Sequence, residues 1–315
     1  MNVLITIDTE INPSRIASPE QIGRNVRRRI WGKVDGAEVG IAYQARCLRE
    51  AGLTGVFFVE SLCASVIDRS LLRDWVAVLR EHGQEVQLHV HPEWAQYLDI
   101  APQHGKGYHL FEYRRDDQKR LIGMARDNLV AAGAPEVCAF RAGNYSANDE
   151  TLEVLAELRL SWDSSYNRCY LGTDCRLTPA PRHNLPFRRG GSGVVPVTNF
   201  TDGLGKARHV QICACSAAEL REALANAMRV GLPAFVIVSH SFELLAENGK
   251  RASETMCRRW LALLRFLSDR RDDMPTLGFR DLDEALFDRA AEDDLSVSRL
   301  ATLGRLTGQL VSNVF

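Results

Sequence analysis

The sequence predicts an α/β fold built around a closed, irregular (β/α) barrel. Short apolar runs alternate with helix-like segments along the 315 residues, which is typical of βαβ units and a parallel sheet. Most of the apolar runs are continuous rather than alternating, which indicates strands that are buried on both faces. Seven or eight such runs suit a closed barrel better than an open sheet.

The predicted strands are the runs of β-branched and aliphatic residues that end at polar side chains. In chain order they are Val3–Ile7, Gly55–Val59, Glu85–His91, Val137–Arg141, a short Arg159–Ser164, Val210–Ala214, Phe235–His240 and Thr276–Phe279. The predicted helices are the longer segments between them: Val39–Ala51, Leu71–His82, Asp116–Ala132, Asn148–Leu158, Ala217–Val230, Glu254–Ser268 and Asp281–Ala290.

Two long stretches, Pro92–Arg115 and Tyr166–Arg208, show neither pattern. Irregular stretches of this length are usually functional or disordered, and the first contains too many aromatic residues for disorder. Trp94 and its neighbours could stack on sugar rings or form a packed lid. No linker divides the chain, so we expect one barrel domain over residues 1–291 and a peripheral helical extension over 292–315.

Composition excludes several classes of function. The chain is 45% hydrophobic and 25% charged, and its formal net charge of −1 gives no overall field for nucleic acid or an anionic membrane. No apolar run is long enough to span a membrane, and no signal peptide is recognisable, so we expect a cytoplasmic protein. The eight cysteines include no CxxC pair, which argues against a structural zinc site and favours reduced thiols.

Polar and titratable residues follow five of the predicted strands. In a barrel the carboxyl ends of the strands meet on one rim, where active sites form. We therefore expect the following side chains to converge: Asp8, Glu10, His89, His91, Arg141, Trp162, Asp163 and His240.

His89 and His91 lie two residues apart on one strand face, with Cα atoms about 6.6 Å apart. That spacing lets both imidazoles reach one metal ion, and a carboxylate from another strand would complete a three-ligand catalytic site. One of Asp8 and Glu10 could be this ligand and the other a general base. Arg141 could keep the base ionised, and His240 could protonate a leaving group. These roles predict metal-assisted hydrolysis of an amide or ester.

Five motifs, in this order, resemble those of the polysaccharide deacetylases, the NodB-homology enzymes of carbohydrate esterase family 4. They are Asp8-Thr9-Glu10, Leu88-His89-Val90-His91-Pro92, Phe140-Arg141-Ala142-Gly143, Asp163-Ser164-Ser165 and Val238-Ser239-His240. The resemblance spans about Val3 to Leu244. It implies a distorted (β/α)7-type barrel, a divalent metal (zinc first, with manganese, cobalt or nickel as alternatives), and removal of N-acetyl groups from amino sugars.

The resemblance also implies a role for each matching residue. Asp8 is the expected general base, Arg141 orients it, His240 is the general acid, and Glu10 and His89 are metal ligands. The family's second histidine falls at Glu93, so His91 is the expected replacement and Glu93 the alternative. The expected substrate contacts are the backbone N–H near Tyr145, together with Trp162, Asp163 and Trp94.

The sequence therefore predicts an N-deacetylase for an amino sugar or glycan, in surface-polysaccharide, lipopolysaccharide or O-antigen biosynthesis. Two alternatives stay open: an amidohydrolase of the same fold acting on a formamide or cyclic ureide, and an inactive carbohydrate-binding protein. The basic run Arg24–Arg29 could contact the phosphates of a nucleotide- or lipid-linked sugar, or form a solvated helix face.

Overall fold

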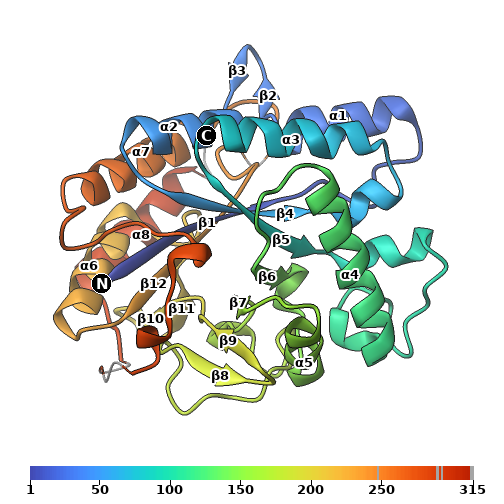
Figure 1. The fold of residues 1–315 in the computed structure, drawn as a ribbon. Helices are drawn as coiled ribbons and strands as arrows, with labels where there is room; N and C mark the ends of the chain where they lie inside the picture. Colours follow the sequence, from blue (N-terminus) through green and yellow to red (C-terminus); the bar gives the residue numbers. More distant parts are fainter. Residues whose placement is uncertain (247, 289–290, 292–293, 313–315) are drawn as a thin grey trace.

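One curled sheet with helices around its outer side forms the centre of the molecule (Figure 1). The computed structural model describes residues 1–246, 248–288, 291 and 294–312. Within these residues the sheet has eight strands, in the order β12-β1-β4-β5-β6-β7-β9-β8. Neighbouring strands are parallel, except that β8 and β9 are antiparallel. The predicted α/β fold and distorted barrel are confirmed, but among the described strands the barrel is not closed, because β12 and β8 at the two ends of the sheet do not pair.

The strands of this sheet are β1 (Asn2–Thr9), β4 (Gly55–Glu60), β5 (Glu85–Val90), β6 (Ala139–Ala142), β7 (Trp162–Asp163), β8 (Phe187–Arg189), β9 (Ser192–Val194) and β12 (Ala234–His240). Two small hairpins lie outside it, formed by β2 (Lys33–Val34) with β3 (Ala37–Glu38), and by β10 (Asn199–Thr201) with β11 (Ala207–His209).

The helices are α1 (Pro19–Arg29), α2 (Ile41–Glu50), α3 (Arg69–Glu81), α4 (Arg115–Ala131), α5 (Asp149–Glu157), α6 (Ala217–Arg229), α7 (Glu254–Ser268) and α8 (Arg299–Ser312). Six of them, α2 to α7, lie where the sequence predicts helices. None of the described helices combines the length and the apolar character needed to cross a lipid bilayer.

Alternation along β1 determines which side chains face the inside of the curled sheet. Val3, Ile5 and Ile7 belong to the large core beneath the helices, whereas Leu4 belongs to a smaller core on the opposite face. Successive side chains of a strand point to opposite faces. Asp8 therefore shares the face of Leu4, inside the sheet.

Three predicted elements are wrong. Val210–Ala214 is not a strand: Val210 hydrogen-bonds with Thr198 and Val238, but Ala214 N–H turns back to the carbonyl of Gln211. Instead of a strand, Thr276–Phe279 contributes a single bridge between Thr276 and Val3.

The predicted helix Asp281–Ala290 is replaced by two short 3₁₀ turns, Phe279–Asp281 and Glu284–Leu286. The Asp283 carboxylate accepts a hydrogen bond from the N–H of Ala285 at 3.0 Å, a local bond that competes with helix continuation. Residues 289 and 290 of that predicted helix lie outside the described residues.

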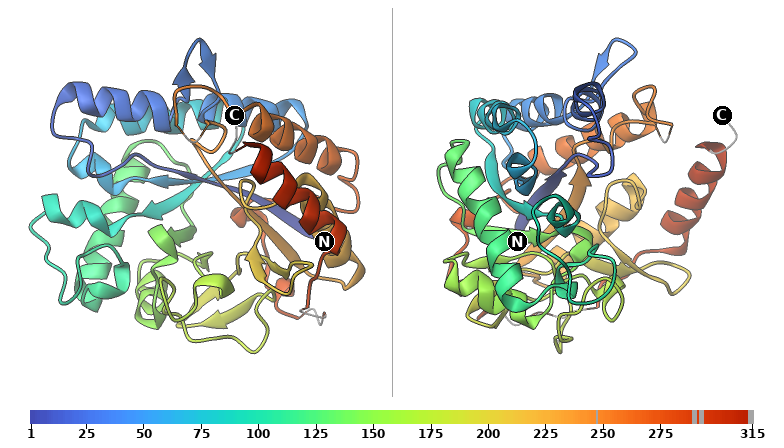
Figure 2. Two further views of the ribbon diagram at one scale, coloured as in Figure 1. Left: turned by 180° about the vertical axis from the view of Figure 1, so that it is seen from behind. Right: turned by 90° about the vertical axis from the view of Figure 1, so that its right-hand side faces the viewer.

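The C-terminal helix α8 lies on the outer surface of the molecule (Figure 2) and contacts α6. The buried Arg305 guanidinium pairs with Glu219 at 3.0 Å and with Asp202 at 3.1 Å. The expected division into residues 1–291 and 292–315 stays a prediction, because residues 292 and 293 are outside the described part of the chain.

Candidate active site

A cavity of about 570 Å³ opens at the carboxyl ends of the central strands. Strands β1, β5 and β12, with the turn after β6, supply most of its polar wall. It is lined by Asp8, Glu10, His89, His91, Glu93, Tyr108, His109, Ala142, Asn144, Tyr145, Tyr170, Asp174, Gln211 and His240.

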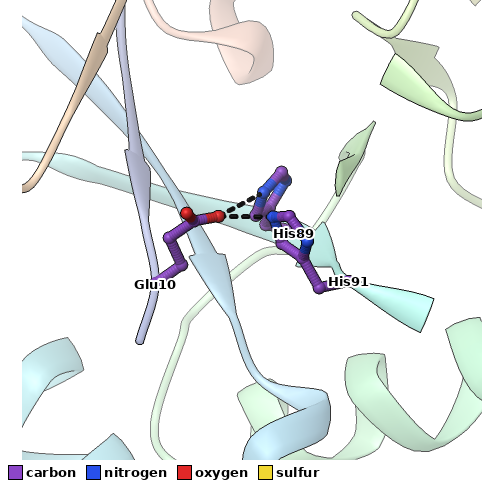
Figure 3. A group of neighbouring side chains, drawn as sticks. All are labelled: Glu10, His89 and His91. Carbon is purple, nitrogen blue, oxygen red and sulfur yellow. Dashed lines mark hydrogen bonds and ion pairs between the residues drawn. The ribbon is translucent and has the colours of Figure 1, made fainter. Parts of the chain in front are cut away.

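Glu10, His89 and His91 point toward one another at one side of this cavity (Figure 3). Oε2 of Glu10 lies 3.3 Å from Nε2 of His89 and 2.5 Å from Nε2 of His91. The three donor atoms all lie within 4.8 Å of one another. Two imidazole nitrogens and one carboxylate oxygen are the donor set of a catalytic zinc site that leaves a position open.

The Nδ1 atoms of both imidazoles have hydrogen-bond partners, which orients the Nε2 atoms toward Glu10. Nδ1–H of His89 donates to the carbonyl oxygen of Arg141 at 2.8 Å, and Nδ1 of His91 lies 3.1 Å from Oε2 of Glu93. Bonds of this kind fix the tautomer and orient a histidine for metal binding. The residues fit a divalent metal, and Glu93 lies behind His91 rather than among the three donors.

Two further charged residues, which sequence reasoning missed, hold this group in place. Arg29 donates to Oε1 of Glu10 at 2.7 Å, so the other oxygen faces the histidines. Glu60 is buried on β4 and accepts hydrogen bonds from the backbone N–H groups of His91 and Leu62. Burial raises the pKa of Glu60 to about 8, against the opposing effect of these bonds and of His91.

Asp8 and Arg141 form a separate buried pair. Nη1 of Arg141 donates to Oδ1 of Asp8 at 2.7 Å and to the hydroxyl of Thr6 at 2.9 Å. The rest of the guanidinium donates to the backbone oxygen and hydroxyl of Ser164 and lies over the ring of Phe58. A guanidinium held this firmly fixes the position of the Asp8 carboxylate through a charged hydrogen bond.

His240 lies beside Asp8, at the paired position of β12, and has a partner that sequence reasoning also missed, Glu243. Oε2 of Glu243 accepts a hydrogen bond from the His240 backbone N–H at 2.8 Å and lies 3.6 Å from Nδ1 of its ring. Burial opposes ionisation of both groups, but the side-chain contact and charge attraction between the imidazolium and the carboxylate stabilise both charged forms. The pKa of His240 is raised to about 9, and that of Glu243 is lowered to about 2. His240 is therefore protonated at neutral pH, as a general acid must be.

The turn after β6 carries backbone strain at the cavity wall. Asn144 and Tyr145 both adopt left-handed conformations, with φ of 54° and 57°. Such conformations cost free energy in residues other than glycine and cluster at functional sites. The Tyr145 ring stacks on Tyr170, with centroids 5.4 Å apart. Tyr170, which sequence reasoning did not select, also lines the cavity, together with Tyr108 and His109 from the aromatic stretch that follows Trp94.

Trp94, Trp162 and Asp163, the other predicted substrate contacts, are absent from the described lining of this cavity. Trp94 is fully buried, and Trp162 stacks on Phe287 with ring centroids 5.7 Å apart. Asp163 accepts hydrogen bonds from Ser165 N–H at 2.9 Å and Ser165 Oγ at 2.6 Å. Burial raises the pKa of Asp163 to about 6.

Comparisons with known proteins bear on the fold. No family model and no curated protein matches the sequence. Among solved structures, one from Mycobacterium smegmatis, described as a polysaccharide deacetylase, is similar over 95% of this chain and 94% of its own. It superposes with a TM-score of 0.56 at 18% sequence identity. The chain has the fold of the polysaccharide deacetylases.

This confirms the resemblance predicted from the five motifs at the level of the fold. A family 4 carbohydrate esterase from Streptomyces lividans, solved with acetate, also aligns with the chain. The alignment covers 87% of this chain and 91% of the esterase chain, with 12% sequence identity and a TM-score of 0.45.

Proposed function

We propose that this protein is a metal-dependent hydrolase that removes an N-acetyl group from an amino sugar. The observation that supports this proposal is the presence, in one cavity, of three separate groups. They are a Glu-His-His donor set, a carboxylate paired with arginine, and a histidine whose pKa is raised by a buried glutamate. A protein that only binds carbohydrate needs neither a base nor an acid.

Glu10, His89 and His91 would hold the metal ion. A divalent metal, with zinc as the first choice, supplies Lewis acidity toward water and the acetyl carbonyl. Asp8 accepts a proton from the attacking water, and Arg141 holds and orients the Asp8 carboxylate. His240 delivers a proton to the departing amine. The backbone at Tyr145 is the proposed contact for the developing oxyanion.

The proposed substrate is an N-acetylated amino sugar or glycan. The aromatic wall of Tyr108, Tyr145 and Tyr170 supports this, because aromatic rings offer flat apolar faces for a sugar ring. We further propose a cytoplasmic role in surface-polysaccharide or O-antigen biosynthesis, which rests on the sequence alone.

Metal content and acetate release test the proposal together. Purified wild-type protein is expected to hold one divalent metal per chain and to release acetate from an N-acetylhexosamine. His89→Ala should lose both properties, because two remaining protein ligands bind a metal far more weakly. His104→Ala is the matched control, because His104 is exposed and lies outside the cavity lining. Full metal occupancy in His89→Ala would rule out the site as described.

A further inference from the structure

A second, larger cavity of about 1110 Å³ adjoins the active site. It lies between α1, the turn that precedes it, β2 and the loop after β12; in Figure 1 this loop (orange) reaches the β2–β3 hairpin. Gln211 and His240 line both cavities, so the two share a wall. We call this second cavity the basic groove, because six of its lining residues are cationic: Arg15, Arg24, Arg27, Arg28, Arg29 and Lys33.

The charge of the basic groove is not a consequence of composition, because the whole chain has a net charge of −1. Among the described residues that line the groove, the only carboxylate is Glu243. That carboxylate is buried and already paired with His240. The groove is therefore a local region of positive charge on a protein that is nearly neutral as a whole.

Among the described residues, four of the six cations have no acidic partner. Arg29 pairs with Glu10 at 2.7 Å and Lys33 with Glu38 at 3.5 Å. Within the described part of the chain, no carboxylate lies within 4 Å of Arg15, Arg24, Arg27 or Arg28.

Helix stability explains only part of this arrangement. Basic residues in the last turn of α1 suit the helix dipole, which accounts for Arg27 and Arg28. It accounts for neither Arg24, one turn earlier, nor Arg15, outside the helix. Arg24 and Arg28 are four residues apart and repel each other along one helix face. An anion bound between these side chains would relieve that repulsion.

A buried asparagine holds Arg15 beside the helix. Asn25 faces inward from α1, accepts a hydrogen bond from Asn12 N–H at 3.1 Å, and donates to the carbonyls of Asn12 at 2.8 Å and Arg15 at 3.2 Å. The turn over residues 12–15 is thus tied to α1. The arginines of the groove are fixed by packed backbone rather than by a mobile tail.

We propose that the basic groove binds a phosphate or diphosphate attached to the sugar in the active site. Five of the six cations are arginines, whose planar guanidinium matches phosphate oxygens with paired hydrogen bonds. The shared wall at His240 and Gln211 places the anion next to the reacting sugar. The inference rests on the proposed function and narrows its substrate to a sugar linked to a nucleotide or a lipid through phosphate. Deacetylation breaks only the amide bond. Water contributes a hydroxyl group to the released acetate and a hydrogen to the amine, and the phosphate ester stays intact.

Calorimetric titration with inorganic diphosphate tests the groove without relying on catalysis. Arg24→Gln/Arg28→Gln is expected to weaken diphosphate binding about 10–100-fold, the usual worth of hydrogen bonds to a charged group. Arg73→Gln/Arg120→Gln removes the same charge from exposed positions on α3 and α4 and should bind as wild type does. No binding by wild type, or equal weakening in both double variants, would overturn the proposal.

Steady-state kinetics identify the source of the phosphate. The substrates are free N-acetylglucosamine, its uridine-diphosphate derivative and a short prenyl-diphosphate-linked derivative. Arg24→Gln/Arg28→Gln should lower the kcat/KM ratio of linked to free sugar about 10–100-fold, chiefly through KM. The better of the two linked substrates identifies a nucleotide or a lipid as the carrier. A preference for the free sugar would contradict the proposal.

The two proposals fail in distinguishable ways. Acetate release from free sugar without diphosphate binding would refute the basic groove alone. Diphosphate binding that depends on Arg24 and Arg28, with no acetate release from any sugar, would refute the deacetylase and leave the groove standing.

Discussion

Asp8 and Glu10 leave the same strand end and line the same cavity, yet their partners differ completely. Asp8 is held by Arg141, whereas Glu10 faces His89 and His91. The sequence predicted that both carboxylates belong to one site, because strand periodicity puts them on one face. The residues alone left open which carboxylate has which partner, because this depends on which strands become neighbours. Only the family resemblance assigned Arg141 to Asp8 and grouped Glu10 with the histidines.

Substitution of each carboxylate should separate the two roles. Glu10→Ala is expected to lower metal affinity first and activity as a consequence. Asp8→Asn should keep near-normal metal affinity but lose about 10²–10⁴-fold in turnover, the usual contribution of a general base. Arg141→Ala should cause a smaller loss of turnover. Metal titration and acetate release on all three variants measure this; loss of metal in Asp8→Asn alone would exchange the roles.

His91 and Glu93 should also differ from each other. His91→Ala removes a proposed ligand, so stoichiometric metal is expected to disappear. Glu93→Ala removes only the carboxylate that orients His91, and such second partners typically contribute about 10–100-fold in affinity. Competition with a chromogenic chelator gives both affinities. A greater loss in Glu93→Ala than in His91→Ala would make Glu93 the ligand.

Glu243 should set the alkaline limit of activity. His240 must be protonated to act as an acid, and its pKa is raised to about 9, so activity falls as pH rises through that value. Glu243→Gln removes the charge that raises the pKa, so the alkaline limb should move to lower pH. Glu254→Gln, at an exposed position on α7, is the charge-matched control. A bound metal ion shifts the alkaline limb of the pH–activity profile in every variant alike, so the comparison between variants is what tests Glu243. If Glu243→Gln leaves that limb where it is in wild type, Glu243 does not set the pKa of His240.

At the scale of elements, long periodic segments were predictable and short or arginine-rich ones were not. Strands β1, β4 and β12 coincide with largely apolar runs, because they are buried on both faces. Helix α1 escaped prediction because it buries only Asn25 and Val26. Its start was nevertheless marked by the Ser18 cap and by Pro19 in the first turn.

Asn25 is expected to hold α1 and its preceding turn together. Asn25→Ala removes three hydrogen bonds at a buried position and leaves backbone groups of the turn without partners. The free energy of unfolding should fall by about 1–3 kcal/mol. Denaturant titration measures this, with exposed Gln103→Ala as the control, expected within about 0.5 kcal/mol of wild type. Equal stability of both variants would show that the turn does not depend on Asn25.

At the scale of the whole molecule, the convergence of strand ends on one rim was predictable from the parallel topology. The shape of the cavity was not, because its remaining walls come from the irregular stretches around Tyr108 and Tyr170, and from Gln211, which lies in a segment wrongly predicted as a strand. These stretches have no periodicity from which a position could be inferred. Glu243 carried only a weak signal, its place three residues after His240.

The C-terminal helix should contribute to global stability through Arg305. Arg305→Ala leaves the buried Glu219 carboxylate without its guanidinium, while Asp202 keeps Arg208 at 2.9 Å; the loss of the Glu219 pair is expected to cost about 3–5 kcal/mol. Arg299→Ala, exposed at the start of the same helix, is the control and should change stability by less than about 0.5 kcal/mol. Chemical denaturation gives both values. A loss as small as that of the control would make α8 dispensable for stability.

The wall shared by the two cavities has a thermodynamic consequence. His240 faces the reacting sugar on one side and the basic groove on the other. A phosphate that enters the groove adds negative charge near the imidazolium and stabilises it, so anion binding and proton binding at His240 are linked. Linkage is reciprocal: the protonated histidine must tighten phosphate binding by the same factor. At alkaline pH, where His240 begins to lose its proton, a phosphorylated substrate would thus keep a larger fraction of this acid protonated than a neutral sugar would.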